Sequence, residues 1–222
     1  MPHDLLFPDA ATASDVLVFA QRASRLGEGT VRLKAQDGIL VLTTPVLAPR
    51  TLLEAVPTVL GMRAVSVDPE LVCDLVVDAG ALVAADDAAA IRLPASAVTA
   101  PWAGISPPRA GWEQIGEIAA ADLATRSQWG IAAVAEAVPT DAGEDVVQTV
   151  RAAVWGEADD GLAGLPLGVA FAAFALGFIA GEEQAMIRRA GPWTRVSLDR
   201  GHVLVRDTVR SGLTSVRTTG AA

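Results

Sequence analysis

The sequence is poor in the side chains that most enzyme and metal sites require. Its 222 residues include one cysteine, two histidines and no tyrosine, and Lys34 is the only lysine. A single cysteine excludes a disulfide-stabilised scaffold, and structural zinc takes about four Cys or His ligands, more than the chain contains. Pyridoxal phosphate enzymes need a lysine amine, and Lys34 lies in a predicted strand. We therefore expect no cofactor and no metal.

Motifs of nucleophilic and phosphate chemistry are also missing. The chain has no Gly-Lys pair, which a P-loop requires, and no Gly-x-Ser-x-Gly. Cys73 is flanked by apolar and acidic residues, which raise the pKa of a thiol rather than lower it. We therefore predict an inert thiol at Cys73, and any imidazole general base must be His202, the only internal histidine.

Basic residues are outnumbered by acidic ones, and the formal net charge is -9. This balance argues against binding to nucleic acid or to an anionic membrane surface. Hydrophobic residues make up 51% of the chain and charged residues 19%, a composition that excludes intrinsic disorder of the whole chain. Residues 1–12 have neither a basic segment nor a long apolar segment, so we expect no signal peptide and a cytoplasmic, soluble protein.

The longest run without charge is Leu162–Ala180. Pro166 interrupts this run and acidic residues flank it on both sides, so it does not read as a membrane span. We expect a buried core helix over Pro166–Ile179 and no membrane partner.

The N-terminal part predicts a helix followed by a hairpin. Ser14 is a suitable N-cap for a helix that ends before Gly27. Asp37-Gly38 is a strong signal for a type I′ hairpin turn. The register about this turn gives one nearly apolar face, formed by the pairs Ala35 with Leu40, Leu33 with Leu42, and Val31 with Thr44.

The middle of the chain predicts short strands and then two helices. We expect strands around Met62–Val67 and Ala90–Pro94. Asp68-Pro69 resembles a helix start, but the β-branched residues that follow favour a strand equally. The helices are expected over Asp122–Val138 and from Asp141, with Glu144 completing a capping box.

The C-terminal part predicts a second β region. Glu183–Ala190 reads as a strand or a short helix, and Trp193–Asp199 and His202–Asp207 form a hairpin about Arg200-Gly201. The helix and hairpin of residues 14–44 recur faintly at 183–207, with Gly201 in the place of Gly38. We predict one α+β domain over residues 1–207, in which an antiparallel sheet from both terminal hairpins packs against central helices, and a disordered tail over 208–222.

Residues 99–116 contain three prolines, three glycines and two tryptophans, Trp102 and Trp112. Such a long irregular stretch in a compact domain is typical of a binding loop or lid, in which Arg109 would stack on one of the indoles. The alternative is that both indoles close the edge of the core.

The predicted terminal hairpin carries the main candidate site. Its register places Arg195 opposite Arg206, and like charges opposed on a sheet repel each other unless an anion lies between them. The same register pairs Asp199 with His202, which would raise the pKa of the imidazole and make it a general acid. Alternatively, the acidic helices supply counter-charges to the arginines, and His202 merely lies at a turn.

Two functions remain open from the sequence. The poor catalytic inventory favours a non-catalytic binding or assembly protein that forms a homo-oligomer. The alternative is an enzyme or ligand-binding protein for an anionic small molecule, with His202 and Asp199 as catalytic residues. Its ligand-binding residues would be Arg109, Arg195, Arg206, Trp102 and Trp112.

Overall fold

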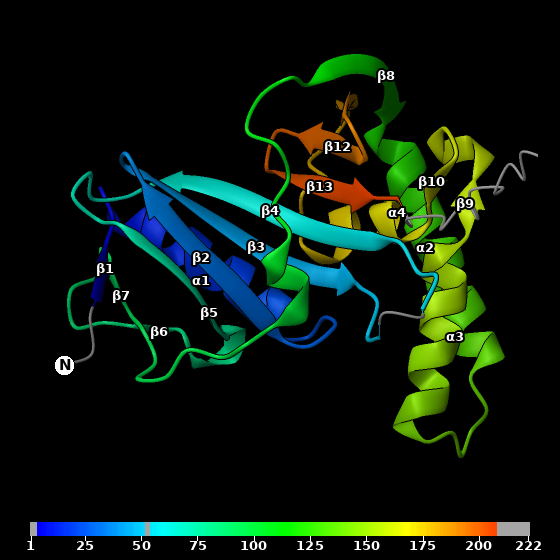
Figure 1. Cartoon of the computed structure of the whole chain (residues 1–222), viewed down its shortest axis with the longest axis horizontal. Helices are drawn as coiled ribbons and strands as arrows, with labels where there is room; N and C mark the ends of the chain where they lie inside the picture. The colour runs from blue at the N-terminus through cyan, green and yellow to red at the C-terminus, as the bar shows by residue number, and fades with distance from the viewer. Residues whose placement is uncertain (1–3, 52–53, 208–222) are drawn as a thin grey trace, which may run out of the picture.

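The computed structural model describes residues 4–51 and 54–207 (Figure 1). Helices and antiparallel strands are mixed along the chain, so the fold is α+β as predicted. The tail predicted over 208–222 lies outside the described residues. The prediction that residues 1–207 form one domain stays a prediction.

An eight-stranded antiparallel sheet forms the body of the molecule, in the order β5-β2-β3-β4-β13-β12-β11-β8. The two terminal hairpins therefore share one sheet, as predicted, and β4 and β13 join at its centre. The strands are β2 (Thr30–Gln36), β3 (Ile39–Leu47), β4 (Thr58–Ser66), β5 (Cys73–Asp78), β8 (Glu113–Ala119), β11 (Gln184–Ala190), β12 (Trp193–Leu198) and β13 (Gly201–Arg206).

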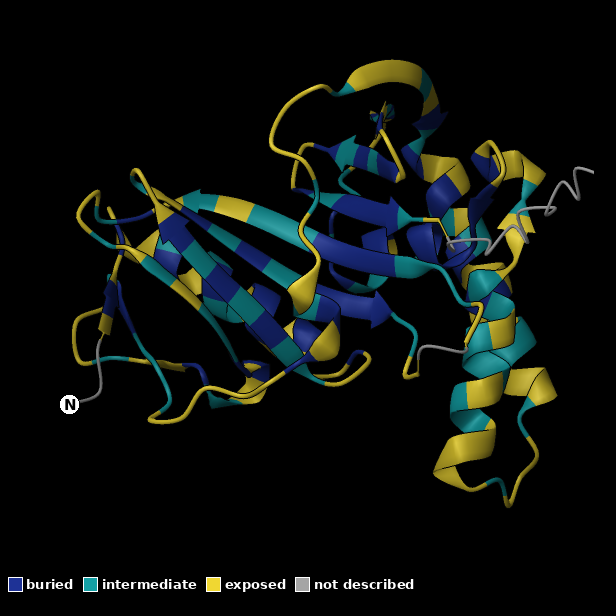
Figure 2. Cartoon of the chain, in the orientation of Figure 1, coloured by how far each residue is buried: buried dark blue, intermediate teal, exposed yellow. Residues whose placement is uncertain are grey.

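Four helices accompany this sheet in the described residues: two lie on one of its faces, a third packs on one of these, and a fourth projects beyond the end of the sheet (Figure 1). They are α1 (Ala10–Ala23), α2 (Ala120–Ala137), α3 (Glu144–Gly156) and α4 (Gly168–Ala175). α1 packs on the N-terminal strands, and α4 packs on β13, β4 and β3 beneath α2 (Figure 1). The main core lies between the helices and the sheet. Along the strands, buried residues that face this core alternate with more exposed residues on the opposite face (Figure 2). We call that opposite face the outer face.

Short elements complete the chain. β1 (Asp4–Leu6), β7 (Ala90–Arg92) and β6 (Val83–Ala84) form a small sheet in the order β1-β7-β6, and β7 fulfils the prediction of a strand at Ala90–Pro94. The remaining short elements are β9 (Ala158–Asp159), β10 (Leu165–Pro166) and the 3-10 turns η1 (Ala79–Ala81), η2 (Pro101–Gly104) and η3 (Asp160–Leu162).

The first hairpin has the predicted turn and register. Asp37 and Gly38 both have positive φ, 55° and 77°, as a type I′ turn requires. Leu33 pairs with Leu42 and Ala35 with Leu40, and all four side chains are buried.

Two predicted helix starts were wrong, and at Asp68-Pro69 the strand alternative is the one observed. α1 begins after Asp9, whose carboxylate accepts a hydrogen bond from Thr12 N (2.7 Å), so Ser14 lies inside the helix. α3 begins after Gly143 rather than at Asp141. Asp68 Oδ1 accepts from Glu70 N (2.9 Å) in a turn, and the strand β5 follows, because β-branched residues fit a pleated sheet better than a helix.

The terminal hairpin has a different register from the predicted one. Its turn is Asp199-Arg200, and the pairs are Ser197 with His202, Arg195 with Leu204 and Trp193 with Arg206. The shift is two residues, so every side chain keeps its predicted face. Gly201 is the first residue of β13 rather than a turn residue. A glycine is needed there because a Cβ would collide with the ring of Phe178.

The uncharged run Leu162–Ala180 contains a buried helix, as predicted, but a shorter one. α4 covers only Gly168–Ala175, and Pro166 belongs to β10. Within residues 4–51 and 54–207, no helix combines the length and the apolar character that crossing a membrane requires.

The two halves of the sheet repeat one layout. α1 precedes β2, β3 and β4, and α4 precedes β11, β12 and β13. The turn that corresponds to Gly38 lies at Gly191, which also has positive φ (56°), and not at Gly201. The recurrence predicted at 183–207 was therefore wrong in its bounds and in its match of glycines, because those residues form three strands and the corresponding helix is α4.

Candidate functional site

An irregular segment crosses the outer face of the sheet, and we call residues 100–112 the strap. Trp102 fixes its first end, with its indole in a small cluster with Leu60, Trp193 and Leu204. Its Nε1 donates to Thr30 Oγ1 (3.2 Å). Trp102 therefore closes the core on this face, which is one of the two roles considered from the sequence.

Side chains of β2 hold the middle of the strap against the sheet. Arg32 binds both carboxylate oxygens of Asp74 (2.7 and 2.8 Å), and the Asp74 carboxylate raises the pKa of Arg32. The Nη1 of Arg32 also donates to Ala103 O (2.8 Å) and to Ser106 Oγ (3.0 Å). Arg109 Nη2 donates to Gln36 Oε1 (3.0 Å). With the hydrogen bond from Trp102 to Thr30, the strap is thus tied to β2 at three residues, Thr30, Arg32 and Gln36.

Trp112 ends the strap beside the C-terminal strands. Its Nε1 donates to Pro108 O (3.0 Å). The guanidinium carbon of Arg195 lies 4.5 Å from the centre of its ring, a cation–π distance. The predicted stacking of Arg109 on an indole was therefore wrong, because Arg109 reaches Gln36 and Arg195 takes the place over Trp112.

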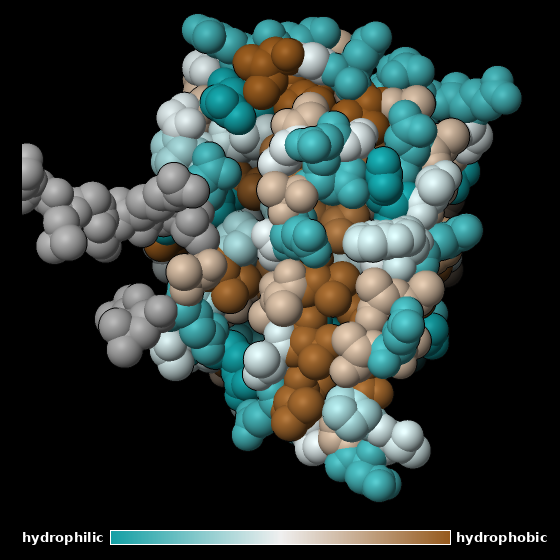
Figure 3. Space-filling view, turned by 90° about the vertical axis from the view of Figure 1, so that its right-hand side faces the viewer, coloured by the Kyte–Doolittle hydropathy of each residue, from teal (hydrophilic) through white to brown (hydrophobic). Residues whose placement is uncertain are grey.

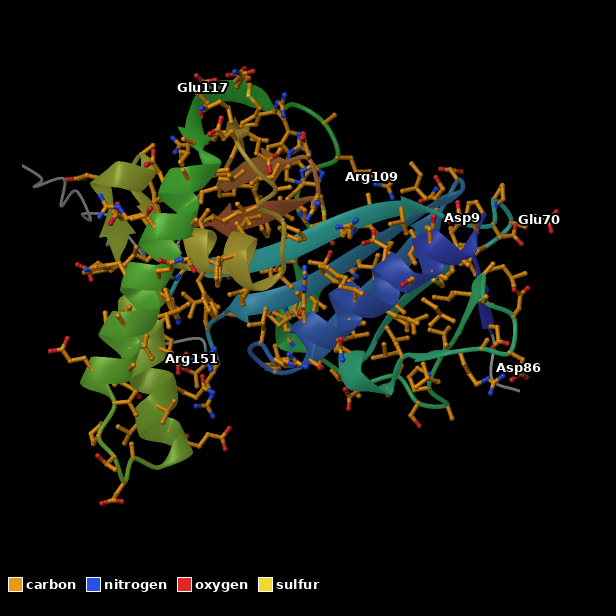
Figure 4. The ribbon with its side chains drawn as sticks, turned by 180° about the vertical axis from the view of Figure 1, so that it is seen from behind. Asp9, Glu70, Asp86, Arg109, Glu117 and Arg151 are labelled. Atoms are coloured by element: carbon orange, nitrogen blue, oxygen red, sulfur yellow. The ribbon has the colours of Figure 1, made fainter. Side chains whose placement is uncertain are left out.

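A groove of about 580 Å³ lies between the strap and the outer face of β2, β3, β4, β12 and β13. Its floor is mostly apolar, and basic side chains surround it. The apolar side chains are Ile39, Val41, Leu60, Met62 and Leu204, and the basic ones are Arg32, Lys34, Arg109 and Arg195. Seen from behind, Arg109 lies beside the long N-terminal strands, and Glu117 marks the outer edge of the sheet on β8 (Figure 4).

Four predicted ligand-binding residues meet in this groove. Trp102, Arg109, Trp112 and Arg195 all line it, although they come from the strap and from β12. The other predicted site residues, Arg206, His202 and Asp199, are not among its lining residues. The described lining of the groove contains no histidine and no cysteine.

The predicted general-acid pair is not formed. Asp199 lies in the turn, where its backbone N–H donates to Glu183 Oε2 (2.8 Å), and His202 lies between Ser197 of β12 and Met62 of β4. Burial lowers the pKa of His202, and the positive charges of Arg195 and Arg188 lower it further. The prediction of a raised pKa was wrong because it depended on the pairing of Asp199 with His202, and the observed partner of His202 on β12 is Ser197.

Sequence reasoning missed Arg188. It lies on β11 directly opposite Arg195, while Arg206 lies opposite Trp193. The opposed arginines of this face are thus Arg188 and Arg195. Of the two alternatives for Glu183–Ala190, the strand is the one observed, and its alternation of side chains places Arg188 on the outer face.

Other chemistry-bearing groups do not form a site in the described part of the chain. Residues 4–51 and 54–207 contain no group of three or more His, Cys, Asp or Glu residues that could hold a metal ion. Cys73 is half-buried, with its Sγ 3.9 Å from Leu33 O, and burial raises the pKa of its thiol. The structure therefore places Cys73 as a packed strand residue.

Two family models match adjoining parts of the chain. Residues 1–108 match a domain of unknown function, DUF8010, and residues 107–210 match a second one, DUF8185. The boundary between the two matches falls within the strap. No curated protein matches the chain.

Solved structures of similar fold are sliding clamps of DNA polymerase III. The clamp of Bartonella birtlesii, bound to griselimycin, is 14% identical over 93% of this chain and 65% of that chain, with a TM-score of 0.51. The clamp of Caulobacter crescentus is 12% identical over 98% of this chain and 69% of that chain, with a TM-score of 0.46. This chain thus spans about 65% of the length of the Bartonella clamp. The chain is therefore similar to two adjoining domains of unknown function and has a sliding-clamp-like fold.

Proposed function

We propose that the protein is a non-catalytic binding protein whose ligand lies in the groove beneath the strap. The observation that carries this proposal is the meeting of Trp112, Arg109 and Arg195 over an apolar floor. A few polar groups around an apolar surface are what a binding site needs for orientation and affinity. The described lining contains no imidazole or thiol, and its one carboxylate belongs to the turn residue Asp37.

The ligand that fits this groove is an extended segment of a partner protein with apolar and acidic side chains. Val41 and Met62 offer apolar contact along the floor. Among the ion pairs of the described residues, Arg32 and Lys34 share Asp74, whereas none involves Arg109 or Arg195. These two guanidinium groups remain available for carboxylates of the partner.

Selection of peptides from a random library on the immobilised protein tests this proposal. We expect enriched peptides to combine acidic and apolar residues, and their binding to be lost in Val41→Glu, which puts a carboxylate on the floor. Arg189→Gln, an exposed change on β11 outside the groove, serves as the control and should keep binding. Binding that survives Val41→Glu, or a selection without enrichment, would contradict the proposal.

A second proposal is that copies of the chain associate through β8. This strand ends the eight-stranded sheet, and Ile115 on it is 51% exposed. The other end strand, β5, is partly covered, because Val98 N donates to Val76 O (2.8 Å). An open edge strand is a template for pairing with another chain.

Light scattering on the purified protein tests this association. We expect a homo-oligomer that Ile115→Lys converts to monomers. Apolar side chains also gather in a stripe on the helical end of the molecule (Figure 3), and Trp129 on α2 is 51% exposed. Trp129→Lys is therefore the informative control, and loss of the oligomer in that variant alone would assign the association to the helices instead.

A further inference from the structure

We propose that the outer face of β11, β12 and β13 binds an oxyanion, a phosphate or carboxylate group, between Arg188, Arg195 and His202. This site adjoins the groove at Arg195. The inference rests on the proposed function only in naming a carboxylate of the groove ligand as one source of the oxyanion.

Two arginines face each other on neighbouring strands without a counter-charge. Arg188 of β11 is directly opposite Arg195 of β12 in the antiparallel ladder. Like charges in this position destabilise a sheet. Burial lowers the pKa of Arg195, and the positive charge of Arg188 lowers it further. None of the ion pairs within residues 4–51 and 54–207 involves either arginine. A bound anion would turn this repulsion into attraction.

The same face holds buried polar atoms without a hydrogen-bond partner. They are Arg195 Nε, Ser197 Oγ and His202 Nδ1, and Arg206 Nε follows farther along the same face of β13. Ser197 is opposite His202 and two residues from Arg195, so the three side chains lie on one face in adjacent rows of the ladder. Buried polar groups in folded proteins nearly always have partners. An oxyanion can accept hydrogen bonds from all three side chains.

On the β8 side, the site is bounded by a carboxylate. In the row of His202 and Ser197, Met186 follows on β11 and then Glu117 on β8. Glu117 is exposed at the edge of the sheet (Figure 4). Its negative charge disfavours an anion beside it, which places the anion nearer to the arginines and His202 than to β8.

His202 suits this site as a neutral donor. Because burial and the two arginines lower its pKa, the imidazole is neutral near pH 7 and has one N–H to donate. A bound oxyanion can therefore be held by two cationic side chains and two neutral donors, the hydroxyl and the imidazole. Charge-assisted hydrogen bonds of the guanidinium groups supply most of the affinity.

Thermal unfolding in sodium phosphate, compared with sodium chloride at equal ionic strength, tests the site. At a hundred times its Kd, phosphate should raise Tm by about 5–10 °C. Arg188→Gln and Arg195→Gln should lose this rise, whereas Arg189→Gln should keep it. Arg189 is the matched control because it is exposed on the same strand, opposite Thr194. Without phosphate, Arg188→Gln should be as stable as the wild type or more so, since a repulsion is removed.

Titration calorimetry with phosphate and with succinate then distinguishes the two sources of the oxyanion. Tighter binding of phosphate assigns the site to a free or nucleotide phosphate, and tighter binding of succinate assigns it to a carboxylate. A rise in Tm shared equally by all variants would be a general salt effect and would overturn the inference, as would no rise at all. Val41→Glu should keep phosphate binding, so loss of peptide binding and loss of phosphate binding are separate results.

Discussion

At Gly38, in the turn of the first hairpin, the backbone conformation rather than the surrounding space restricts which residue can be accommodated. A Cβ at Gly38 would meet Pro69 Cα at 3.7 Å, an ordinary contact, but φ there is +77°. A β-branched residue adopts this conformation only at a cost.

Gly38→Val should therefore lower the free energy of unfolding by about 1–2 kcal/mol, as measured by urea denaturation. Gly104→Val is the control, because nothing lies within 4 Å of its Cβ and its φ is not positive. That variant should change stability by about 0.5 kcal/mol or less. Equal effects of the two changes would show that the turn conformation is not what Gly38 provides.

The half-buried imidazole of His202 gives the fold a dependence on pH. Its pKa in the folded state lies below the ordinary value of 6.5, so the unfolded chain binds a proton more readily than the folded one. Stability is then highest above that value and falls as the pH decreases towards the folded pKa. The lowered pKa values of Asp9 and Asp74 act in the same direction, but only below their ordinary value of 3.8.

Urea denaturation at about pH 7.5 and pH 5.5, on either side of the ordinary histidine pKa, measures this effect. We expect the wild type to be less stable at the lower pH and the difference to shrink in His202→Gln. The variant His3→Gln, which removes the other histidine, should retain the wild-type difference. A difference that persists in His202→Gln would exclude His202 as its cause.

Among the elements, the middle of the strap is held by one side chain of β2, Arg32. Arg32 donates to Ala103 O and Ser106 Oγ while Asp74 holds its guanidinium. Lys34 is also paired with Asp74 (3.3 Å), and none of the hydrogen bonds among the described residues joins it to the strap. The two neighbouring cations thus share a carboxylate and differ in their contact with the strap.

Arg32→Met should accelerate amide hydrogen exchange in residues 103–112, because the strap loses its central anchor. Lys34→Met should leave the exchange of the strap unchanged, although it removes a charge from the same carboxylate. Stability should fall by about 1–3 kcal/mol in Arg32→Met, mainly because acceptors of the strap lose their donor. Equal exchange in both variants would mean that Trp102 and Trp112 hold the strap without Arg32.

The elements also show what the sequence could and could not predict. At Asp37-Gly38, the turn residues and the apolar alternation indicate the same register, so the first hairpin was predicted correctly. At Gly201, the glycine is required by the ring of Phe178, a contact between distant segments that no local pattern contains. The predicted register was therefore two residues off, and with it the pairing of Asp199 with His202.

For the candidate site, local composition indicated which segment takes part. The role of each residue in it depends on contacts between segments that are distant in the sequence. The prolines and tryptophans of 99–116 predicted a loop with Trp102, Arg109 and Trp112, and these residues line the groove with Arg195. Local sequence does not determine which strands pair or in which register, so the pairing of Arg188 with Arg195 was not predicted. The partner of an arginine across a sheet depends on register, which is set by contacts far along the chain.

At the scale of the whole molecule, the two matched domains are not separated in space. β4 belongs to the first match and β13 to the second, and they are hydrogen-bonded neighbours in one sheet. Helix α4 of the second match packs on β3 and β4 of the first, and the side chain of Leu176 occupies the space beside Gly61. Each half thus covers apolar surface of the other.

We expect residues 1–106 and 107–222, expressed separately, to lack cooperative thermal unfolding, and the mixture to regain it by reconstitution. The reason is that each fragment exposes a central strand edge and the apolar residues beneath α4. Calorimetry on each fragment and on the mixture measures this. A sharp transition in the isolated fragment 1–106 would show that the halves are independent domains, contrary to the single-domain prediction for 1–207.

The central pairing of β4 with β13 also constrains how a growing chain acquires its structure. Met62 pairs with His202, so the ladder joins positions about 140 residues apart. At translation speeds of about 5–20 residues per second, β4 waits on the order of 10 s for its partner. During that interval its edge is open on the nascent polypeptide. Contacts of such long range are made slowly. The unpaired edge of β4 is therefore most exposed to aggregation while the chain is still on the ribosome, before β13 has emerged.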